Sequence, residues 1–296
     1  MADRNTAVEI RRAAEEMAAL FPALMIEADR VAHTAAAGLH GRRRAGPGET
    51  FWQHRAYGFG DPVGAIDWRQ SARAADRLFV RQNEWEASAA VWIWRDPSRS
   101  LDYASRDAPT KRRRADVVAT ALAILLSQAG ERVGLMGAQR RPFYGRAAPS
   151  LFLQALMAPA ADISSQPPSA RLSAGARVVL ISDFFVDPET IRAAVLSYAG
   201  AGATGALLQI VDPAEEDFPF SGRMLFQDAE TRDQRLFGEA GAARRDYRAY
   251  FAAHRDAMKD VARRCGWTFI SHRTDRPAQS ALLALYAALS DPGKLK

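Results

Sequence analysis

The chain has 296 residues, of which 48% are hydrophobic and 25% are charged, as in ordinary globular proteins. Its longest uninterrupted aliphatic stretch, Ala121 to Leu126, is too short to span a membrane, which takes roughly 18 apolar residues. Its single cysteine, Cys265, excludes an internal disulfide and a cysteine-based zinc site. The first residues show no apolar core with a small-residue cleavage site, so we expect a cytoplasmic protein without a signal peptide.

The charge balance is basic, with a net charge of +6 and a pI of about 9.7. Basic residues cluster at 42–44 and at 111–114, and the second cluster falls in the first turn of a predicted helix, where positive charge opposes the helix dipole. A solvated helix face explains such a cluster simply, and an acidic protein surface is the alternative that we carry forward. Five arginines are assigned to such a partner: Arg99, Arg112, Arg113, Arg43 and Arg44.

Residues 1–85 are expected to form an N-terminal extension. Apolar residues at three- and four-residue steps predict an amphipathic helical arm over 8–37, broken near Pro22. Residues 41–51 are rich in glycine and arginine, which is typical of a flexible linker, although the backbone of such a loop can also cradle an anion. No Gly-Lys-Ser/Thr ending follows, so we exclude a Walker-type nucleotide loop.

The later part of the extension, residues 55–73, combines a turn signal with charges beside an aromatic ring. Glycine, aspartate and proline at 60–62 favour a tight turn. Acidic and basic residues surround a tryptophan at short helical spacing, so we expect this segment to brace the extension against the main domain. Its characteristic residues are Arg55, Tyr57, Gly60, Asp61, Asp67, Trp68 and Arg73.

From residue 86 to residue 290, short apolar runs alternate with helical patterns, which predicts an α/β domain with a doubly wound, mostly parallel sheet. The runs at 91–95 and 178–182 are each closed by an acid, and we expect them to be adjacent or nearly adjacent central strands. Further strands are predicted at 133–137, 206–211 and 268–270, a hairpin at 223–238, and helices at 109–130, 150–156, 188–198, 242–264 and 279–290.

Oxygen-bearing side chains follow the 91–95 strand at every second position, as Asp96, Ser98 and Ser100. In open α/β sheets, ligands bind where the carboxyl ends of the strands meet their loops. One carboxylate and two hydroxyls are hard oxygen ligands that suit Mg²⁺ or Mn²⁺, and they are too few to complete an octahedral shell. The metal would therefore keep water molecules and one position open for another molecule.

This Asp-x-Ser-x-Ser loop resembles the metal-ion-dependent adhesion site of von Willebrand factor A domains, as does the Ser-Asp pair that closes the 178–182 strand. Those domains usually add a threonine hydroxyl between the two, and this chain has no threonine between Thr120 and Thr190. We expect a serine at a predicted helix start to replace it, and affinity on the order of 10⁻⁴ to 10⁻³ M. The predicted metal ligands are Asp96, Ser98, Ser100, Asp183 and Ser150.

Together with the 55–73 segment, this loop is similar to an uncharacterised bacterial family that joins such a segment to a von Willebrand A-like domain. Genes of that family commonly lie beside those of MoxR-type AAA+ ATPases. The resemblance implies a non-enzymatic adaptor that works with a MoxR-type chaperone ATPase in protein assembly or maturation, with a carboxylate of the partner filling the open metal position. Many members carry N-terminal membrane helices, which this sequence does not show, so a membrane role is not carried over.

Two other functional classes stay open. A metal-dependent phosphoryl-transfer enzyme of the haloacid dehalogenase type also begins with an aspartate after the first strand, but it needs a second acid where this chain has Ser98. No Gly-x-Ser-x-Gly elbow indicates a serine hydrolase. A basic nucleic-acid-binding protein is the third class, although no recognised reader motif accompanies the arginine clusters.

Overall fold

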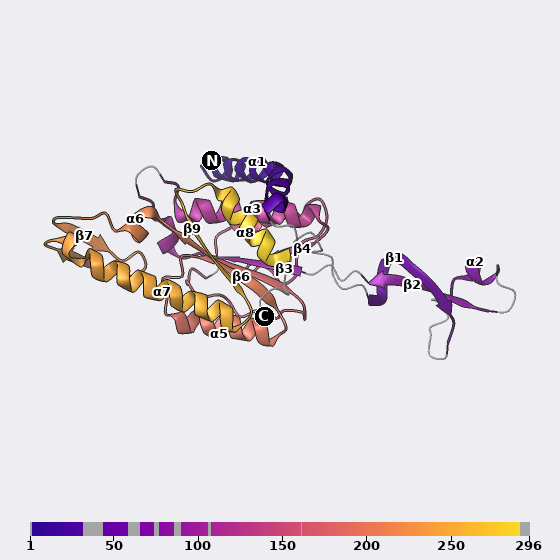
Figure 1. Ribbon diagram of the computed structural model, residues 1–296. Coiled ribbons are helices and arrows are strands. Elements are labelled where there is room, and N and C mark those ends of the chain that lie inside the picture. The colour runs from indigo at the N-terminus through magenta and orange to yellow at the C-terminus, as the bar shows by residue number, and fades with distance from the viewer. Residues whose placement is uncertain are drawn as a thin grey trace. The chain divides into compact units, whose positions relative to one another are not determined.

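The computed structural model describes residues 2–31, 44–58, 66–73, 77–85, 90–105, 108–160 and 162–290 (Figure 1). The chain divides into two compact units. Residues 1–37 and 89–296 form an α/β unit, and residues 38–88 form a smaller one. The second segment of the α/β unit begins at residue 89, and its first segment includes the helical arm that the sequence analysis assigned to the extension.

The α/β unit is built on a sheet of five parallel strands. In spatial order these are β4 (Arg132–Leu135), β3 (Ala90–Arg95), β5 (Arg177–Ser182), β6 (Thr204–Val211) and β9 (Thr268–Arg273). The expected mostly parallel α/β fold is confirmed, and so is the adjacency of the two acid-terminated strands, since Trp92 of β3 lies opposite Val178 of β5. The order of connections reverses between β3 and β5, and the carboxyl side of such a reversal is the usual ligand site of doubly wound sheets.

Helices cover both faces of this sheet (Figure 1). On one face lie α3 (Lys111–Gln128), α4 (Ala148–Met157) and α8 (Ala278–Ser290), and α1 (Ala2–Val31) packs on the outer side of α3 and α8. On the other face α5 (Pro188–Gly200) packs against α7 (Arg244–Arg264). Helix α3 is buried along most of its length because the sheet covers one side and α1 covers the other.

Helix α1 packs on the α/β unit through one stripe of side chains. Ile10, Ala14 and Met17 are buried, and residues at this spacing share one face of a helix. The helix continues through Pro22, so the predicted break near this residue is wrong. A proline removes one backbone hydrogen bond and strains the preceding turn, and in a helix of 30 residues the turns on either side remain.

The core under α5 and α7 depends on one close approach between β3 and β4. This core buries several large aromatic side chains, among them Trp94, Tyr198 and Trp267. Trp92 of β3 lies against Gly134 of β4, where an added Cβ would stand 2.5 Å from the indole ring. A glycine at this position is therefore required for the indole to lie over the edge strand.

The smaller unit is an antiparallel ribbon of β1 (Arg44–Ala56) and β2 (Phe79–Trp85), with the short helix α2 (Trp68–Ser71) between them in sequence. The glycine-rich loop predicted for 41–51 is therefore wrong from Arg44 onward. The register jumps from Ala45 to Thr50, so the glycine-rich residues form an irregularity inside a strand instead of a linker.

Hydrogen bonds join α2 to β2 within the smaller unit. Ser71 Oγ accepts from the Phe79 amide at 2.9 Å, and the Asp67 amide donates to the Phe79 carbonyl at 2.8 Å. Trp68 is 62% exposed on this unit. Its bracing role toward the main domain stays a prediction, as do those of Arg55, Tyr57, Asp67 and Arg73, while Gly60, Asp61 and Arg43 lie outside the described residues.

The remaining elements lie near the carboxyl edge of the sheet or follow β6. They are the 3₁₀ helix η2 (Arg99–Asp102), α6 (Pro213–Asp217), β7 (Met224–Gln227), β8 (Gln234–Phe237) and η3 (Ala240–Ala243). Strands β7 and β8 pair antiparallel, so the predicted hairpin is confirmed. Within the described ranges, no helix is both long enough and apolar enough to cross a bilayer.

Candidate functional site

Asp96 lies directly after β3, at the point where the strand order reverses, and its side chain is fully buried. Its Oδ1 accepts a hydrogen bond from the Ser98 amide at 2.8 Å, and its Oδ2 accepts one from the Ser182 hydroxyl at 2.5 Å. Burial raises the pKa of Asp96, the Ser182 hydrogen bond opposes this rise, and the nearby charge of Asp183 adds to it. Both oxygens of this carboxylate are thus already bonded within the fold.

The two serines of the Asp-x-Ser-x-Ser loop are brought together as the sequence predicted. Ser98 Oγ and Ser100 Oγ are 3.0 Å apart, close enough for one hydroxyl to donate to the other. Ser98 is buried and precedes η2, whose Leu101 is fully buried and anchors the loop. The loop is therefore held by contacts within the chain.

Asp183 follows β5 and lies at the same edge as Asp96, as expected from the parallel strands. The next residue, Phe184, has φ of 56° and is fully buried, so this turn holds a bulky side chain in the left-handed region. The turn is held by the Phe184 amide, which donates to Ser182 Oγ at 2.8 Å, and by Gln209, whose amide nitrogen donates to the Asp183 carbonyl at 3.1 Å.

Lys111, the first residue of α3, places its ammonium group inside this edge, and its side chain is only 1% exposed. Lys111 Nζ lies 2.8 Å from Asp183 Oδ2 and 2.5 Å from Glu215 Oε1. The ring centroid of Phe185 is 5.0 Å away, within range of a cation–π contact. Burial acts to lower the pKa of Lys111, but the two carboxylates outweigh it and the pKa is raised, so the side chain is a cation.

Glu215 is positioned by a capping box at the start of α6. Asp212 caps the helix by accepting from the Ala214 amide at 2.8 Å, and Glu215 Oε2 accepts from the Asp212 amide at 2.9 Å. The other oxygen of Asp212 accepts from the Ser105 amide at 2.8 Å, which ties α6 to the segment after η2. Sequence reasoning missed Lys111 and Glu215; the Asp-Pro-Ala-Glu run after β6 is a capping signature that could have indicated the second.

The donor set present does not fit a divalent cation. The separation of Ser98 Oγ and Ser100 Oγ would suit neighbouring ligands of Mg²⁺, which lie roughly 3 Å apart in an octahedron. However, Asp183 already holds the Lys111 ammonium, and both oxygens of Asp96 already accept hydrogen bonds. In the part of the chain that the structure describes, no group of three His, Cys, Asp or Glu side chains could hold a metal ion.

Ser150, the fifth predicted ligand, is not brought to this edge. It lies in the first turn of α4 and accepts a hydrogen bond from Arg11 of α1 at 3.2 Å. The far end of α4 is the one near Asp96, because Arg95 donates to the Leu156 carbonyl there at 3.2 Å. Six residues of helix, or about 9 Å, separate Ser150 from that end. The expectation that it completes a metal shell is therefore not supported.

Residues 53–257 match the sequence model of the family described as Protein of unknown function DUF58. The chain belongs to this family. The proteins Rv1480 of Mycobacterium tuberculosis and Mb1516 of Mycobacterium bovis, both described as uncharacterized, are each 30% identical to it over 250 residues, which are 78% of this chain and 76% of theirs.

Two solved structures are similar to the DUF58 chain at a lower sequence identity. One is an aerotolerance-related membrane protein of Bacteroides fragilis with multiple mutations to serines, at 15% identity and a TM-score of 0.43. The other is the conserved hypothetical protein BatB of Bacteroides thetaiotaomicron, at 14% identity and a TM-score of 0.39. Each comparison covers 68% of this chain and 98% of the other.

Two of the five arginines assigned to a partner, Arg112 and Arg113, have bonds within the DUF58 chain. Arg112 pairs with Asp102 and donates to the Ser98 carbonyl at 2.8 Å, so it helps to hold the Asp-x-Ser-x-Ser loop. Arg113 pairs with Glu9 of α1 at 2.9 Å. Arg99 is exposed on η2, Arg43 lies outside the described residues, and Arg44 is described only as part of β1.

An aromatic hollow of about 460 Å³ opens over the buried ion pairs. Lys111 and Glu215 are among the residues that line it, and the β7–β8 hairpin contributes Phe226 and Phe237 to the lining. A second hollow of about 600 Å³ shares Phe185 and Tyr247 with the first. Phe185 is 40% exposed, and Tyr250, in the second hollow, is 71% exposed. The carboxyl edge thus presents aromatic side chains over polar groups that are already paired.

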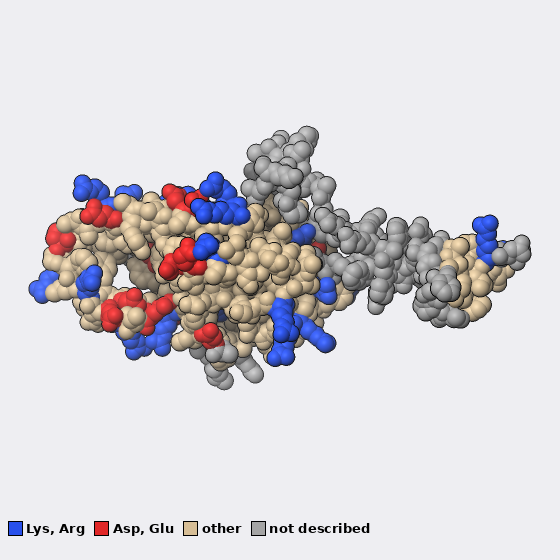
Figure 2. Space-filling model, turned by 90° about the horizontal axis from the view of Figure 1, so that it is seen from below, with Lys and Arg blue, Asp and Glu red and all other residues tan. Residues whose placement is uncertain are grey.

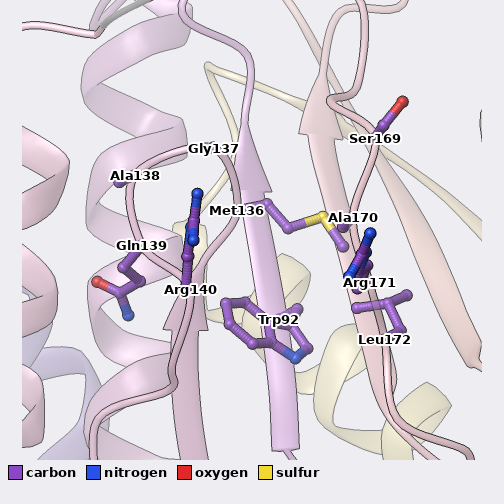
Figure 3. Close-up of a pocket in the computed structure, with 10 residues that line it drawn as sticks. All are labelled: Trp92, Met136, Gly137, Ala138, Gln139, Arg140, Ser169, Ala170, Arg171 and Leu172. Atoms are coloured by element: carbon purple, nitrogen blue, oxygen red, sulfur yellow. The ribbon is translucent and has the colours of Figure 1, made fainter.

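A third cavity, of about 740 Å³, lies beside the edge strand β4 (Figure 3). Trp92 and Met136 lie in its interior, and Arg140 and Arg171 stand on its two sides. Within the described part of the chain, neither guanidinium group takes part in a hydrogen bond or an ion pair. These two arginines are therefore available to an acidic group from outside, and sequence reasoning did not single them out.

Proposed function

We propose that this DUF58 chain is a non-enzymatic adaptor with a von Willebrand A-type domain, which binds a MoxR-type AAA+ ATPase in the cytoplasm and serves protein assembly or maturation. The observation that carries the proposal is the aromatic surface at the carboxyl edge. Phe185 and Tyr250 are exposed there beside two hollows, while the polar groups beneath are bonded to one another. Exposed aromatic side chains around concave surfaces are typical of protein-binding sites, where they contribute much of the affinity.

The von Willebrand A-type assignment is supported by where the resembling residues lie. Asp96, Ser98 and Ser100 follow β3 and Asp183 follows β5, and these strands are neighbours in the sheet. The resemblance requires this arrangement, because its first-strand loop and its later aspartate must face one crevice. In this proposal the crevice serves binding and not catalysis.

The acidic-partner part of the proposal is supported by Arg140 and Arg171, whose guanidinium groups are available beside a cavity (Figure 3). Arg99 adds a third exposed positive charge on η2. By contrast, the face in Figure 2 intersperses basic and acidic side chains over the described part, without the continuous basic stripe typical of nucleic-acid binding. The charges favour an acidic protein surface over a nucleic acid.

The test is binding of the purified full-length protein to the MoxR-type ATPase encoded nearest to its gene, measured by biolayer interferometry. Phe185→Ala with Tyr250→Ala should weaken the complex by about tenfold or more, because the two rings are central to the aromatic surface. Leu196→Ala is the control: Leu196 is 47% exposed near the C-terminal end of α5 and lines none of these cavities.

Failure of the wild-type protein to bind the ATPase would overturn the proposal. Equal binding by the double variant and the wild type would show that the aromatic surface is not the contact. Retention of the wild-type protein on DNA that falls steeply with salt would favour the nucleic-acid alternative instead.

A further inference from the structure

The carboxylates at the carboxyl edge all accept hydrogen bonds from donors within the chain. Asp183 lies in the loop after β5 and Glu215 lies in α6, and an isolated buried carboxylate is strongly unfavourable. Lys111 lies between them with its ammonium at hydrogen-bond distance from both. The other two acids are bonded to neutral donors: Asp96 to the Ser98 amide and the Ser182 hydroxyl, and Asp212 to two backbone amides.

Lys111 lies at a position in its helix that is unfavourable for a positive charge. It is the first residue of α3, where positive charge opposes the helix dipole. Its aliphatic stem is buried and does not extend into solvent. Its Nζ lies 5.0 Å from the ring centroid of Phe185 and 5.8 Å from that of Tyr103. A lysine so placed is held by the two carboxylates and the two rings, not by helix formation.

We infer that Lys111 is the resident cation of this edge: its ammonium group does the charge balancing that a divalent metal does in a metal-ion-dependent adhesion site. This role needs no bound partner and so stands apart from the proposed adaptor function. The ammonium joins the loop after β5 to α6, as a shared metal would join its ligands. A second cation at Asp183 would lie beside Lys111 and be repelled by it.

With Lys111 as the resident cation, the loop after β3 needs no metal ion to hold it. Its shape is set by the Ser98 amide bond to Asp96, by the Ser98–Ser100 hydroxyl contact and by Arg112, all of which are bonds within the chain. The carboxyl edge is therefore formed in the absence of Mg²⁺ or Mn²⁺. Chelators should not change its conformation.

The experiment is a titration of the full-length protein with Mn²⁺, followed by electron paramagnetic resonance, together with melting curves in EDTA and in 10 mM MgCl₂. The wild-type protein should bind no Mn²⁺ at about 1 mM, the weak end of hard-cation sites, and should melt equally in both buffers. Lys111→Met keeps the length of the stem and removes the charge, leaving Asp183 and Glu215 without their cation. This variant should bind Mn²⁺ with Kd of about 1 mM or below and melt about 2–4 °C higher with Mg²⁺.

Arg113→Met is the matched control, because it removes a positive charge from the same helical turn but from an exposed pair with Glu9. It should bind no Mn²⁺. Wild-type binding of Mn²⁺ that is lost in Ser98→Ala with Ser100→Ala would overturn the inference, and so would a folded Lys111→Met protein that binds no Mn²⁺. If Lys111→Met does not fold with or without metal, the Mn²⁺ titrations of the wild type and of the Ser98→Ala, Ser100→Ala variant test the inference without it.

Discussion

Ser182 Oγ donates a hydrogen bond of 2.5 Å to Asp96 Oδ2, which joins two residues 86 positions apart in the chain. The same hydroxyl accepts from the Phe184 amide, so it fixes both the end of β3 and the turn after β5. The Asp96 amide also donates to the Ile181 carbonyl at 2.9 Å, which extends the parallel ladder by one residue. Asp96 therefore has a structural role in addition to any role in binding.

The first prediction concerns that role. Asp96→Ala should lower the free energy of unfolding by about 2–4 kcal/mol, because it leaves the Ser98 amide and the Ser182 hydroxyl buried without an acceptor. Asp96→Asn keeps an oxygen for the Ser98 amide, and its new amide can donate to Ser182, so its cost should stay below about 1.5 kcal/mol. Urea unfolding of both variants without metal gives the two values. Equal stability of Asp96→Ala and the wild type would show that these hydrogen bonds contribute nothing.

The second prediction concerns the close approach of β3 and β4. Gly134→Ala should destabilise the protein by about 1–3 kcal/mol, because the new methyl group would stand 2.5 Å from the Trp92 ring. Gly200→Ala is the same chemical change in the last turn of α5, where no atom lies within 4 Å of an added Cβ. It should be neutral or stabilising by up to about 1 kcal/mol. Thermal unfolding with tryptophan fluorescence measures both, and a shift in emission of the folded Gly134→Ala protein would report a displaced Trp92.

The third prediction concerns His272 of β9, which is 4% exposed. Burial lowers the pKa of His272 to about 4 from an ordinary 6.5; Arg114 adds to the fall, and Asp275 opposes it. Between these values the unfolded chain binds more protons than the folded one, so stability rises with pH. The contribution of His272 to the free energy of unfolding is fully present above about pH 6.5 and is lost as the pH falls toward 4. It amounts to about 3 kcal/mol.

His272→Leu removes the titrating group from this buried position. Urea midpoints measured from pH 4 to pH 7 should show a shallower pH dependence for the variant than for the wild type. Parallel pH profiles for the two proteins would contradict the buried neutral state of His272.

Much of the fold follows from short-range signals in the sequence. The strands ending at Asp96 and Asp183 are apolar runs closed by an acid, and parallel neighbours bring such ends together, so the edge could be foreseen. The strand that begins at Arg44 could not be foreseen, because its glycine-rich residues have low strand propensity. Only the residues on either side of them pair with β2. The helix through Pro22 is a similar case, in which the surrounding turns outweigh a local breaker.

The central pair of the edge was missed for a different reason. Lys111 stands in a Lys-Arg-Arg-Arg run that has the pattern of a solvated helix face, and Glu215 follows a strand about a hundred residues later. Their contact depends on the three-dimensional path of α3 and α6, which no local pattern encodes. Other residues of the run also bond within the chain: Arg112 holds the loop after β3, and Arg114 donates to the Thr274 carbonyl at 2.6 Å.

The fourth prediction concerns the availability of Arg140 and Arg171 to an acidic partner. Arg140→Ala with Arg171→Ala should slow association with the MoxR-type ATPase several-fold at low salt, and the difference should shrink near 1 M salt, where the Debye length is about 3 Å. Dissociation should change less, because the two side chains are exposed beside the cavity and not buried in the free protein. Arg192→Ala with Arg263→Ala removes the same charge from the exposed faces of α5 and α7, where each arginine pairs with an acid of its own helix. If this control slows association as much as the first pair does, the effect comes from net charge and the cavity is not the contact.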